Sequence, residues 1–281
     1  MAEPTVRAAT GGTLSGAPES VTAGAPGCAP GGAPGGVSLP DMARFALASD
    51  VTWPAATVET LGGWNLRLSA EAAGSRANSA WVRSPADMAE DDAIDAVEAF
   101  YRSHGRAARF QIWPADAALD AALAARGWVP YDACAILARP AGGDWPAAGE
   151  GTAAVRLEMP LAMASRLWAE GGVGAERQAV FARAGGARAL FLGRIGQQPA
   201  GMVGVTLDGE VAVTQALWVD PTLRGRGLGA TLMAAAGRAA AELGATAIAH
   251  AVVTDNAPAR ALYARLGFQS VGHYHYRRAP A

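Results

Sequence analysis

The chain has 281 residues, 51% of them hydrophobic, so it can form one large domain or two small ones around a sizeable core. Its formal net charge of −2 excludes a global positive field that would attract nucleic acid. Two distant cysteines, Cys28 and Cys134, do not indicate a disulfide framework or a zinc site. We find no apolar run long enough to cross a bilayer and no secretory signal, so we expect a cytoplasmic protein without a membrane partner.

The first half of the chain begins with a segment rich in Gly, Ala and Pro, which predicts a disordered tail over residues 1–38. Strand and helix patterns then alternate. Strands are predicted at 63–69, 76–83, 108–113 and 133–139, and helices at 91–105 and 117–127. The segment 141–151 has the composition of a linker.

The second half continues the alternation and predicts a mixed α/β fold, with a mixed sheet flanked by helices. Strands are predicted at 153–159, 188–196, 200–208, 210–219, 247–253 and 269–277. Two helices are expected between the first two of these strands, and further helices at 227–244 and 257–267.

An internal repeat relates the two halves. The stretch VVTDNAPARALYARLGF, residues 252–268, aligns with IWPADAALDAALAARGW, residues 112–128, and both predict a strand, a polar turn, a helix, a glycine and an aromatic residue. We therefore predict two related modules, at 39–140 and 152–281, each with a central mixed sheet flanked by helices.

The glycine-rich stretch WVDPTLRGRGLGATLM, residues 218–233, lies between a predicted strand and a predicted helix. Such a turn can bind an anion, because glycine allows close approach and the first N–H groups of a helix are free to donate. Arg224 and Arg226 add two charges that suit phosphate. Gly225, Gly227 and Ala230 also fit a loose dinucleotide pattern, but five residues separate the strand from the first glycine, and the Gly-Lys-Ser/Thr ending of a Walker loop is absent. A turn without a ligand is the simplest alternative.

Two motifs at matching spacing make residues 152–278 resemble the GNAT superfamily of N-acetyltransferases. The phosphate loop of that family, R/Q-x-x-G-x-G/A, is matched by Arg224, Gly227 and Gly229. Its later signature is matched by Asn256, Ala259, Leu262, Tyr263, Gly267 and Phe268. From about Leu39 the chain also resembles two-module members of the superfamily whose first module is degenerate.

The resemblance implies acetyl-CoA as cosubstrate and a small-molecule or peptide amine as acceptor. The residues themselves lead us to expect no metal. The implied cofactor-binding residues are Leu217, Trp218, Val219, Arg224, Gly225, Arg226, Gly227, Leu228, Gly229 and Asn256. The loop would hold the pyrophosphate, and the strand before it would separate from its neighbour and bind the pantetheine arm. A backbone N–H near Leu217 or Trp218 would stabilise the oxyanion. Tyr263 would be the catalytic partner of the coenzyme sulfur.

Several residues keep two interpretations. Asn256 can be a helix N-cap alone, or can also contact the pantetheine. Glu210 and His250 are candidate general bases acting through water, but either can be an ordinary structural residue, and proton loss to solvent is a fair alternative. His273 and His275 share a strand face by spacing and are more plausible beside the acceptor pocket, or paired with nearby side chains, than as metal ligands.

The first module lacks the features of a coenzyme site. Four acids, Asp87, Glu90, Asp91 and Asp92, stand in the loop where glycines and arginines would be needed, and they would repel pyrophosphate. In the repeat register, Leu123 replaces Tyr263 and Asp116 replaces Asn256. Arg76 and Asn78 are candidates for shaping the acceptor pocket, although a hydrogen-bonded strand end explains them more simply.

These observations together predict direct acetyl transfer to an amine, without a covalent enzyme intermediate. A non-catalytic acyl-CoA-binding or regulatory module is the main alternative, because the strand before the loop has no carboxylate. A dinucleotide-dependent oxidoreductase is a more distant one.

Overall fold

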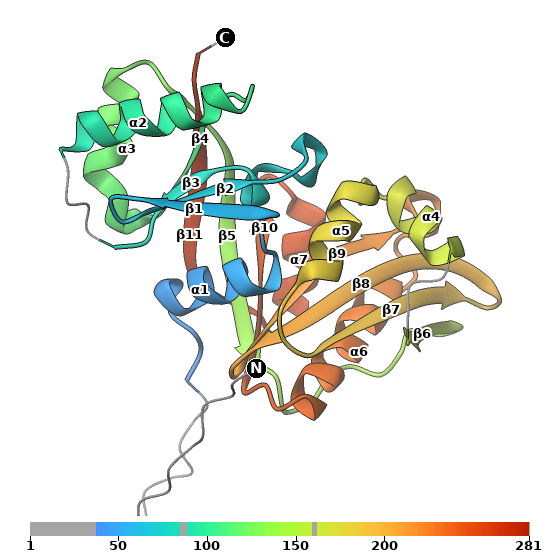
Figure 1. The fold of residues 1–281 in the computed structure, drawn as a ribbon. Coiled ribbons are helices and arrows are strands. Elements are labelled where there is room, and N and C mark those ends of the chain that lie inside the picture. The colour runs from blue at the N-terminus through green and yellow to red at the C-terminus, as the bar shows by residue number, and fades with distance from the viewer. Residues whose placement is uncertain (1–37, 85–88, 159–161, 281) are drawn as a thin grey trace, which may run out of the picture. The chain divides into compact units, whose positions relative to one another are not determined.

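The computed structural model describes residues 38–84, 89–158 and 162–280. They form one mixed sheet of eleven strands in the order β1-β2-β3-β4-β11-β5-β10-β9-β8-β7-β6, with helices against both faces (Figure 1). The mixed α/β class predicted from the sequence is therefore confirmed. The predicted tail, apart from its last residue, lies outside the described residues. No helix in the described part of the chain is long and apolar enough to span a bilayer.

The described part of the first half contains three α-helices and five strands. Their bounds are α1 Met42–Thr52, β1 Thr57–Leu61, β2 Trp64–Leu68, β3 Ala80–Val82, α2 Glu90–Ser103, β4 Arg109–Ile112, α3 Ala117–Ala125 and β5 Val129–Pro140. Short 3₁₀ turns lie at η1 Glu71–Ala73, η2 Ser75–Ala77 and η3 Pro114–Asp116.

The second half continues with β6 Thr152–Leu157, α4 Ala162–Glu170, α5 Ala175–Arg183, β7 Arg188–Ile195, β8 Gln198–Asp208 and β9 Val211–Val219. A 3₁₀ turn η4 Pro221–Leu223 leads to α6 Leu228–Glu242, β10 Ala247–Val253, α7 Ala257–Arg265 and β11 Gln269–Arg278.

The structure corrects the sequence-based elements at three places. Helix α1 and strand β1 were not anticipated. The strand predicted at 76–83 is confined to Ala80–Val82, because Arg76 and Ala77 belong to the turn η2 and Asn78 follows it. The Asn78 side chain explains that turn: its Oδ1 accepts from the Ser69 backbone N–H at 2.8 Å, and its Nδ2 donates to the Ala70 carbonyl at 2.9 Å.

The two halves repeat the same arrangement and exchange their last strands. β3 is parallel to β4, and β9 is parallel to β10, as the repeat leads one to expect. However, β4 pairs with β11 from the other end of the chain, and β10 pairs with β5. β5 and β11 also pair with each other, antiparallel, at the centre of the sheet. The exchange makes the sheet continuous across both halves.

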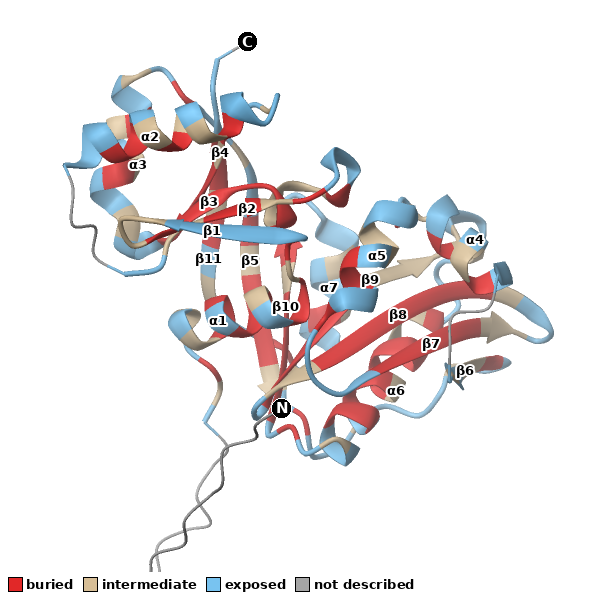
Figure 2. Ribbon diagram, in the orientation of Figure 1, coloured by how far each residue is buried: buried red, intermediate tan, exposed pale blue. Residues whose placement is uncertain are grey.

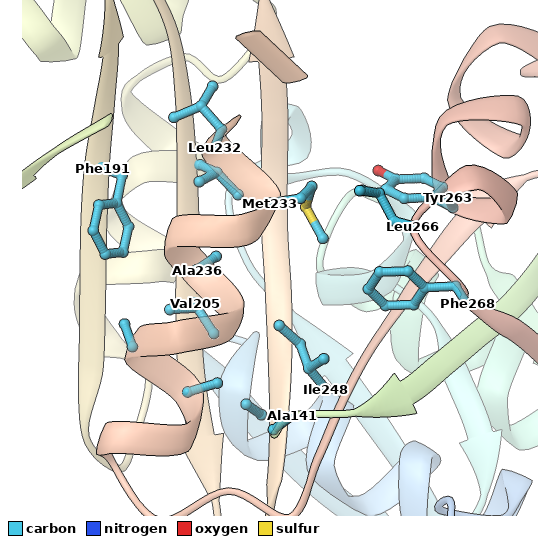
Figure 3. Close-up of a cluster of buried hydrophobic side chains, with 14 of the residues drawn as sticks. Ala141, Phe191, Val205, Leu232, Met233, Ala236, Ile248, Tyr263, Leu266 and Phe268 are labelled. Atoms are coloured by element: carbon cyan, nitrogen blue, oxygen red, sulfur yellow. The ribbon is translucent and has the colours of Figure 1, made fainter. Parts of the chain in front are cut away.

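Separate hydrophobic clusters fill the two faces of the sheet in the second half, where β7 and β8 are largely buried (Figure 2). On one face, α6 and α7 enclose a cluster that includes Phe191, Leu232, Tyr263 and Phe268 (Figure 3). On the other face, α4 and α5 cover the same strands with a cluster that includes Trp53. The helices α2 and α3 cover a third cluster in the first half.

Candidate functional site

The glycine-rich loop follows β9 and ends at the first turn of α6. Gly225 and Gly227 have positive φ angles of 77° and 84°, a conformation that favours glycine. Gly227 is the N-cap of α6, and the first turn of this helix contains no acidic residue. Arg224 and Arg226 are exposed beside it, and the Arg224 Nε donates to the Val219 carbonyl at 3.1 Å. The loop therefore presents free helix amides and two cations to solvent.

Packing holds this loop in place. Leu228 is buried and anchors the first turn of α6 in the core. A side chain at Gly229 would approach Leu262 of α7 to 3.1 Å, so glycine allows α7 to pack closely there. On the other side, the Gly149 N–H donates to the Thr231 Oγ1 at 3.0 Å, so the segment before β6 also supports the loop.

The strand that leads to the loop separates from its neighbour. β9 pairs with β10 only over Val211–Val213, and beyond this point the two parallel strands diverge. A bulge lies on the diverging part, because Gln215 is opposite Gly204 while Trp218 is opposite Met202. Ala216, one of the two β9 residues that lie opposite the single residue Val203 of β8, has a φ of +50°, which is rare for a residue with a side chain. A bulge removes backbone groups from the ladder, so this strand can offer them to a ligand.

Helix α4 fixes the bulge. The buried Trp168 donates from its Nε1 to the Ala216 carbonyl at 2.9 Å. At the end of the helix, a side chain at Gly171 would overlap the Trp218 ring at 2.4 Å, so glycine makes room for that ring. The position of the bulge thus depends on two contacts with α4 and its end, the Trp168 hydrogen bond and the close approach of Gly171 to the Trp218 ring.

A cavity of about 280 Å³ lies at the divergence. Its lining comes from β9 and β10, from α5 and α7, and from the first half of the chain, and its charged or titratable residues include Arg76, Asp132, Arg177 and His250. Tyr263, from the cluster on one face, and Trp53, from the cluster on the other, both line it. The cavity therefore passes through the sheet at the divergence. A larger, more open cavity of about 680 Å³ shares Asp132, Cys134, Val253 and Tyr274 with it.

Tyr263 lies on α7 with its ring in the cluster of Figure 3 and also lines the cavity. It is 7% exposed, and burial raises its pKa to about 12. A proton transfer from this phenol to a thiolate with a reference pKa of about 8.5 would be uphill by about 5 kcal/mol. The group is therefore suited to donate a hydrogen bond and not to ionise.

His250 lies beside Tyr263, with 3.8 Å between the ring centroids. It is buried, and neither ring nitrogen has a hydrogen-bond partner among the described residues. Burial and, to a smaller extent, the charge of Arg76 lower its pKa to about 3. His250 is neutral at pH 7 but a weak base. Glu210, the other candidate base, lies in the turn before β9 and does not line the cavity.

Several lining residues were not anticipated from the sequence. Arg177 of α5 and Trp53 after α1 line the cavity, as do Gln215, Asp132 and Tyr274. Arg76 was a candidate, and its Nη1 donates to the Gln215 Oε1 at 3.0 Å, whereas Asn78 serves the hydrogen-bonded turn described above. Nothing in the local pattern around Arg177 or Trp53 marks them, because their role arises only from long-range packing.

The remaining candidates have local roles. Asn256 is an N-cap of α7, since its Oδ1 accepts from the Ala259 N–H at 3.2 Å. The His275 Nε2 lies 2.9 Å from the Asp120 Oδ1, and both His273 and His275 line the larger cavity. The described residues contain no group of three or more His, Cys, Asp or Glu side chains that could hold a metal ion.

The corresponding region of the first half differs. Of its four acids, Asp87 lies outside the described residues, and Glu90, Asp91 and Asp92 form the first turn of α2. Arg126 at the end of α3 pairs with Asp91 at 2.7 Å. Where β3 and β4 diverge, Trp81 and Trp113 pack with 6.3 Å between their ring centroids. In the first half, acidic residues thus stand where the second half has its glycine loop, and aromatic rings stand where the second half has its open cavity.

Comparison with known proteins agrees with this arrangement. Residues 159–268 match the model of the acetyltransferase (GNAT) family. No curated protein matches the chain in sequence. A GCN5-related N-acetyltransferase from Kribbella flavida has a similar structure, with a TM-score of 0.66 and 18% identity over 85% of this chain and 95% of that one.

Two further solved structures share the fold. A tandem GNAT protein from the clavulanic acid biosynthesis pathway has a TM-score of 0.59 and 17% identity over 85% of this chain and 89% of that one. A functionally unknown conserved protein from Staphylococcus epidermidis has a TM-score of 0.59 and 11% identity over 82% and 95%. Residues 159–268 therefore match the GNAT acetyltransferase family, and the chain shares its fold with solved GNAT proteins, one of which is a tandem GNAT protein.

Proposed function

We propose that this chain is an acetyl-CoA-dependent N-acetyltransferase that transfers the acetyl group directly to an amine. The observation that carries the proposal is the cavity at the divergence of β9 and β10, because it connects a buried tyrosine with the strand that leads into the glycine loop. The general activity of the matched family supports the same chemistry.

The residues present fit the coenzyme. Two glycines with positive φ, exposed N–H groups at the start of α6 and the charges of Arg224 and Arg226 suit a pyrophosphate. The diverging strand, from Leu217 to Val219, offers backbone groups to the pantetheine amides. Asn256, at the facing end of β10, can contact the same arm in addition to capping α7.

Acetyl-CoA would supply an activated thioester carbonyl to the acceptor. The acceptor ammonium first loses one proton, and the nitrogen lone pair then forms the N–C bond while the C–S bond breaks. The nitrogen loses its second proton, and the leaving thiolate gains one, so that the products are the N-acetyl compound, free coenzyme A and one proton. A bulge N–H near Leu217 or Trp218 would stabilise negative charge on the acetyl oxygen, and Tyr263 would donate a hydrogen bond to the sulfur.

Among the described residues, the lining of the smaller cavity offers no strong buried base for the first proton. His250 has a pKa of about 3, so it does not take up a proton near neutral pH. Asp132 is the one carboxylate in the described lining of the smaller cavity. Loss of the proton to water in the open part of the cavity, or to Asp132, accounts for this step.

Calorimetric titration with acetyl-CoA, with NADH as a control ligand, tests the proposal. We expect one acetyl-CoA site per chain and no NADH binding. Arg224→Glu should abolish acetyl-CoA binding, whereas Arg238→Glu, at an exposed position further along α6, should leave it unchanged. Amine-dependent release of free coenzyme A should follow in a screen of amines.

Two outcomes would contradict the proposal. Absence of acetyl-CoA binding would show that the glycine loop is only a turn. Binding without release of coenzyme A to any amine would favour the second candidate, a non-catalytic acyl-CoA-binding module. That candidate is supported by the lack of a carboxylate on β9 near the bulge.

A further inference from the structure

Two arginines from different halves of the chain line the cavity on the face of the sheet opposite Tyr263. Arg76 comes from the turn η2 and Arg177 from α5. Each guanidinium carbon lies 5.9 Å from the centre of the Trp53 ring, so one aromatic side chain contacts both cations. Trp53 therefore fixes the pair near the bulge of β9.

Neither arginine has a carboxylate partner within the described residues. Some other half-buried or buried arginines do: Arg44 pairs with Asp208 at 2.7 Å, and Arg67 pairs with Asp50 at 2.8 Å. Arg76 instead donates to the neutral Gln215, and Arg177 donates to the Gly172 carbonyl at 3.3 Å. The buried Nε of Arg177 has no hydrogen-bond partner in the described structure. Both arginines are half-buried, and a partly desolvated charge without a counter-charge is less stable than one in water, so the pair is suited to receive an anion.

Electrostatics agrees with this geometry. Burial first, and then the positive charge of Arg76, lower the pKa of the Arg177 guanidinium. An anion between the two would offset the repulsion by Arg76 and would supply a counter-charge to the partly desolvated Arg177 guanidinium. Planar guanidinium groups bind carboxylate and phosphate oxygens in pairs, so either group suits the site.

The pair also lies at the right place for an acceptor. Arg76 bonds to Gln215, the residue that precedes the bulge, and the cavity continues from there to Tyr263. Its volume of about 280 Å³ is at the lower limit of small-molecule sites. Asp132, on the side shared with the larger cavity, could balance an ammonium group.

We propose that the acceptor is a small amine with an anionic group, a carboxylate or a phosphate, which Arg76 and Arg177 bind while its nitrogen faces the bulge of β9. This inference rests on the proposed function and adds the substrate class. It assigns the acceptor-binding role to both halves of the chain.

Matched pairs of amines test the inference in the acetyl-CoA-dependent assay. The pairs are amino acids and their amides, which test carboxylate, and glucosamine 6-phosphate and glucosamine, which test phosphate. We expect at least a tenfold higher kcat/KM for the anionic member of one set.

Arg76→Gln and Arg177→Gln should each raise KM for that anionic member about tenfold. Both variants should leave the acetyl-CoA Kd unchanged, which also shows that they fold. Arg177→Lys should retain part of the preference.

Arg183→Gln is the matched control, since Arg183 lies exposed at the end of the same helix, and it should change neither constant. Equal kcat/KM for charged and neutral members, or an unchanged preference in both glutamine variants, would overturn the inference.

If acetyl-CoA binds but no amine turns over, the same pairs of amines are titrated into the protein saturated with coenzyme A. Tighter binding of an anionic member, lost in Arg177→Gln, supports the inference, and equal binding overturns it. Failure of the proposed function itself appears separately, as absence of acetyl-CoA binding.

Discussion

At the scale of single residues, Tyr263 is the side chain on which the proposed chemistry depends most. Its phenol lines the cavity while its ring packs on His250 and Phe268, so Tyr263→Phe removes the hydroxyl and keeps the packing. A hydrogen bond to a charged group contributes about 1.5–3 kcal/mol, so kcat should fall roughly 10- to 100-fold. The acetyl-CoA Kd should change little, because the hydrogen bond would strengthen only as the thiolate leaves. Steady-state kinetics and calorimetry measure the two effects.

A second buried tyrosine provides the control. Tyr101 donates to the Arg67 carbonyl at 2.8 Å in the core of the first half. Tyr101→Phe should cost about 1 kcal/mol of stability, but should leave kcat unchanged. Wild-type turnover in Tyr263→Phe would remove Tyr263 from the mechanism.

His250 predicts a specific pH dependence of stability. An unfolded histidine binds a proton near its reference pKa of about 6.5, whereas folded His250 does so only near about 3. Between these values the unfolded state binds more protons, so the contribution of His250 to stability is full above about pH 6.5 and is lost as the pH falls. The loss should approach about 1.4 kcal/mol per pH unit below pH 6.5.

Thermal unfolding from pH 7.5 to 4.5 checks this prediction. His250→Phe should flatten the decline relative to the wild type, because phenylalanine fits among Tyr263 and Phe268 without a group to protonate. At pH 7 the variant should be at least as stable, since both ring nitrogens of His250 lack partners in the described structure. Parallel pH profiles for the two proteins would show that His250 does not titrate as its burial requires.

At the scale of the elements, the bulge of β9 depends on α4. Trp168→Phe removes the hydrogen bond to the Ala216 carbonyl but retains most of the buried ring. The loss of one such bond costs about 1 kcal/mol of stability, and a less fixed bulge should lower kcat roughly fivefold if its N–H stabilises the oxyanion. Chemical denaturation and the coenzyme A release assay give the two values.

Trp145 supplies the matched control for this experiment. Its Nε1 donates to the Ala141 carbonyl at 3.0 Å, and its ring packs on α6 at Gly237, away from the bulge. Trp145→Phe removes a bond of the same kind and should reduce stability alone. An equal fall of kcat in both variants would assign the effect to general loosening instead of to the bulge.

The elements also show what sequence patterns can and cannot predict. The glycine loop, α6 and α7 were predicted because turn glycines and helix caps act locally in the chain. Helix α1 was missed because much of its buried surface consists of small residues such as Ala46, Ala48 and Ser49, and not of a clear apolar stripe. Strand β1 was missed because it is an exposed edge strand without apolar alternation.

The same reasoning applies to the candidate site. Arg224, Tyr263 and Asn256 belong to motifs whose spacing is visible in the sequence. Arg177 and Trp53 approach Arg76 only after α5 packs against the turn η1, which directly precedes η2. The periodic spacing of residues within a helix or strand does not reveal a contact between distant segments. The residues that line the cavity could therefore be identified only from the folded structure.

At the scale of the whole molecule, the exchange of β5 and β11 makes each half depend on the other. β5 is twelve residues long and lies between β11 and β10 at the centre of the sheet. A chain of residues 152–281 alone would expose the edge of β10, and β11 would lose both of its neighbours. Exposed edges of buried strands promote association, so this fragment should aggregate or remain unfolded and should not bind acetyl-CoA.

A cut chain distinguishes loss of strands from loss of covalent connection. Gly142 and Gly143 are exposed, so a protease site inserted between them cuts the chain after folding. The two pieces should stay together in gel filtration, and the complex should bind acetyl-CoA with the affinity of the intact chain, because every strand is present. The separate fragments 38–142 and 143–281, expressed together, should form the same complex, whereas each alone should not give a folded monomer by circular dichroism. A monomeric fragment 152–281 that binds acetyl-CoA as tightly as the full chain would show that the exchanged strand is dispensable. The first half would then serve the acceptor side of the cavity only.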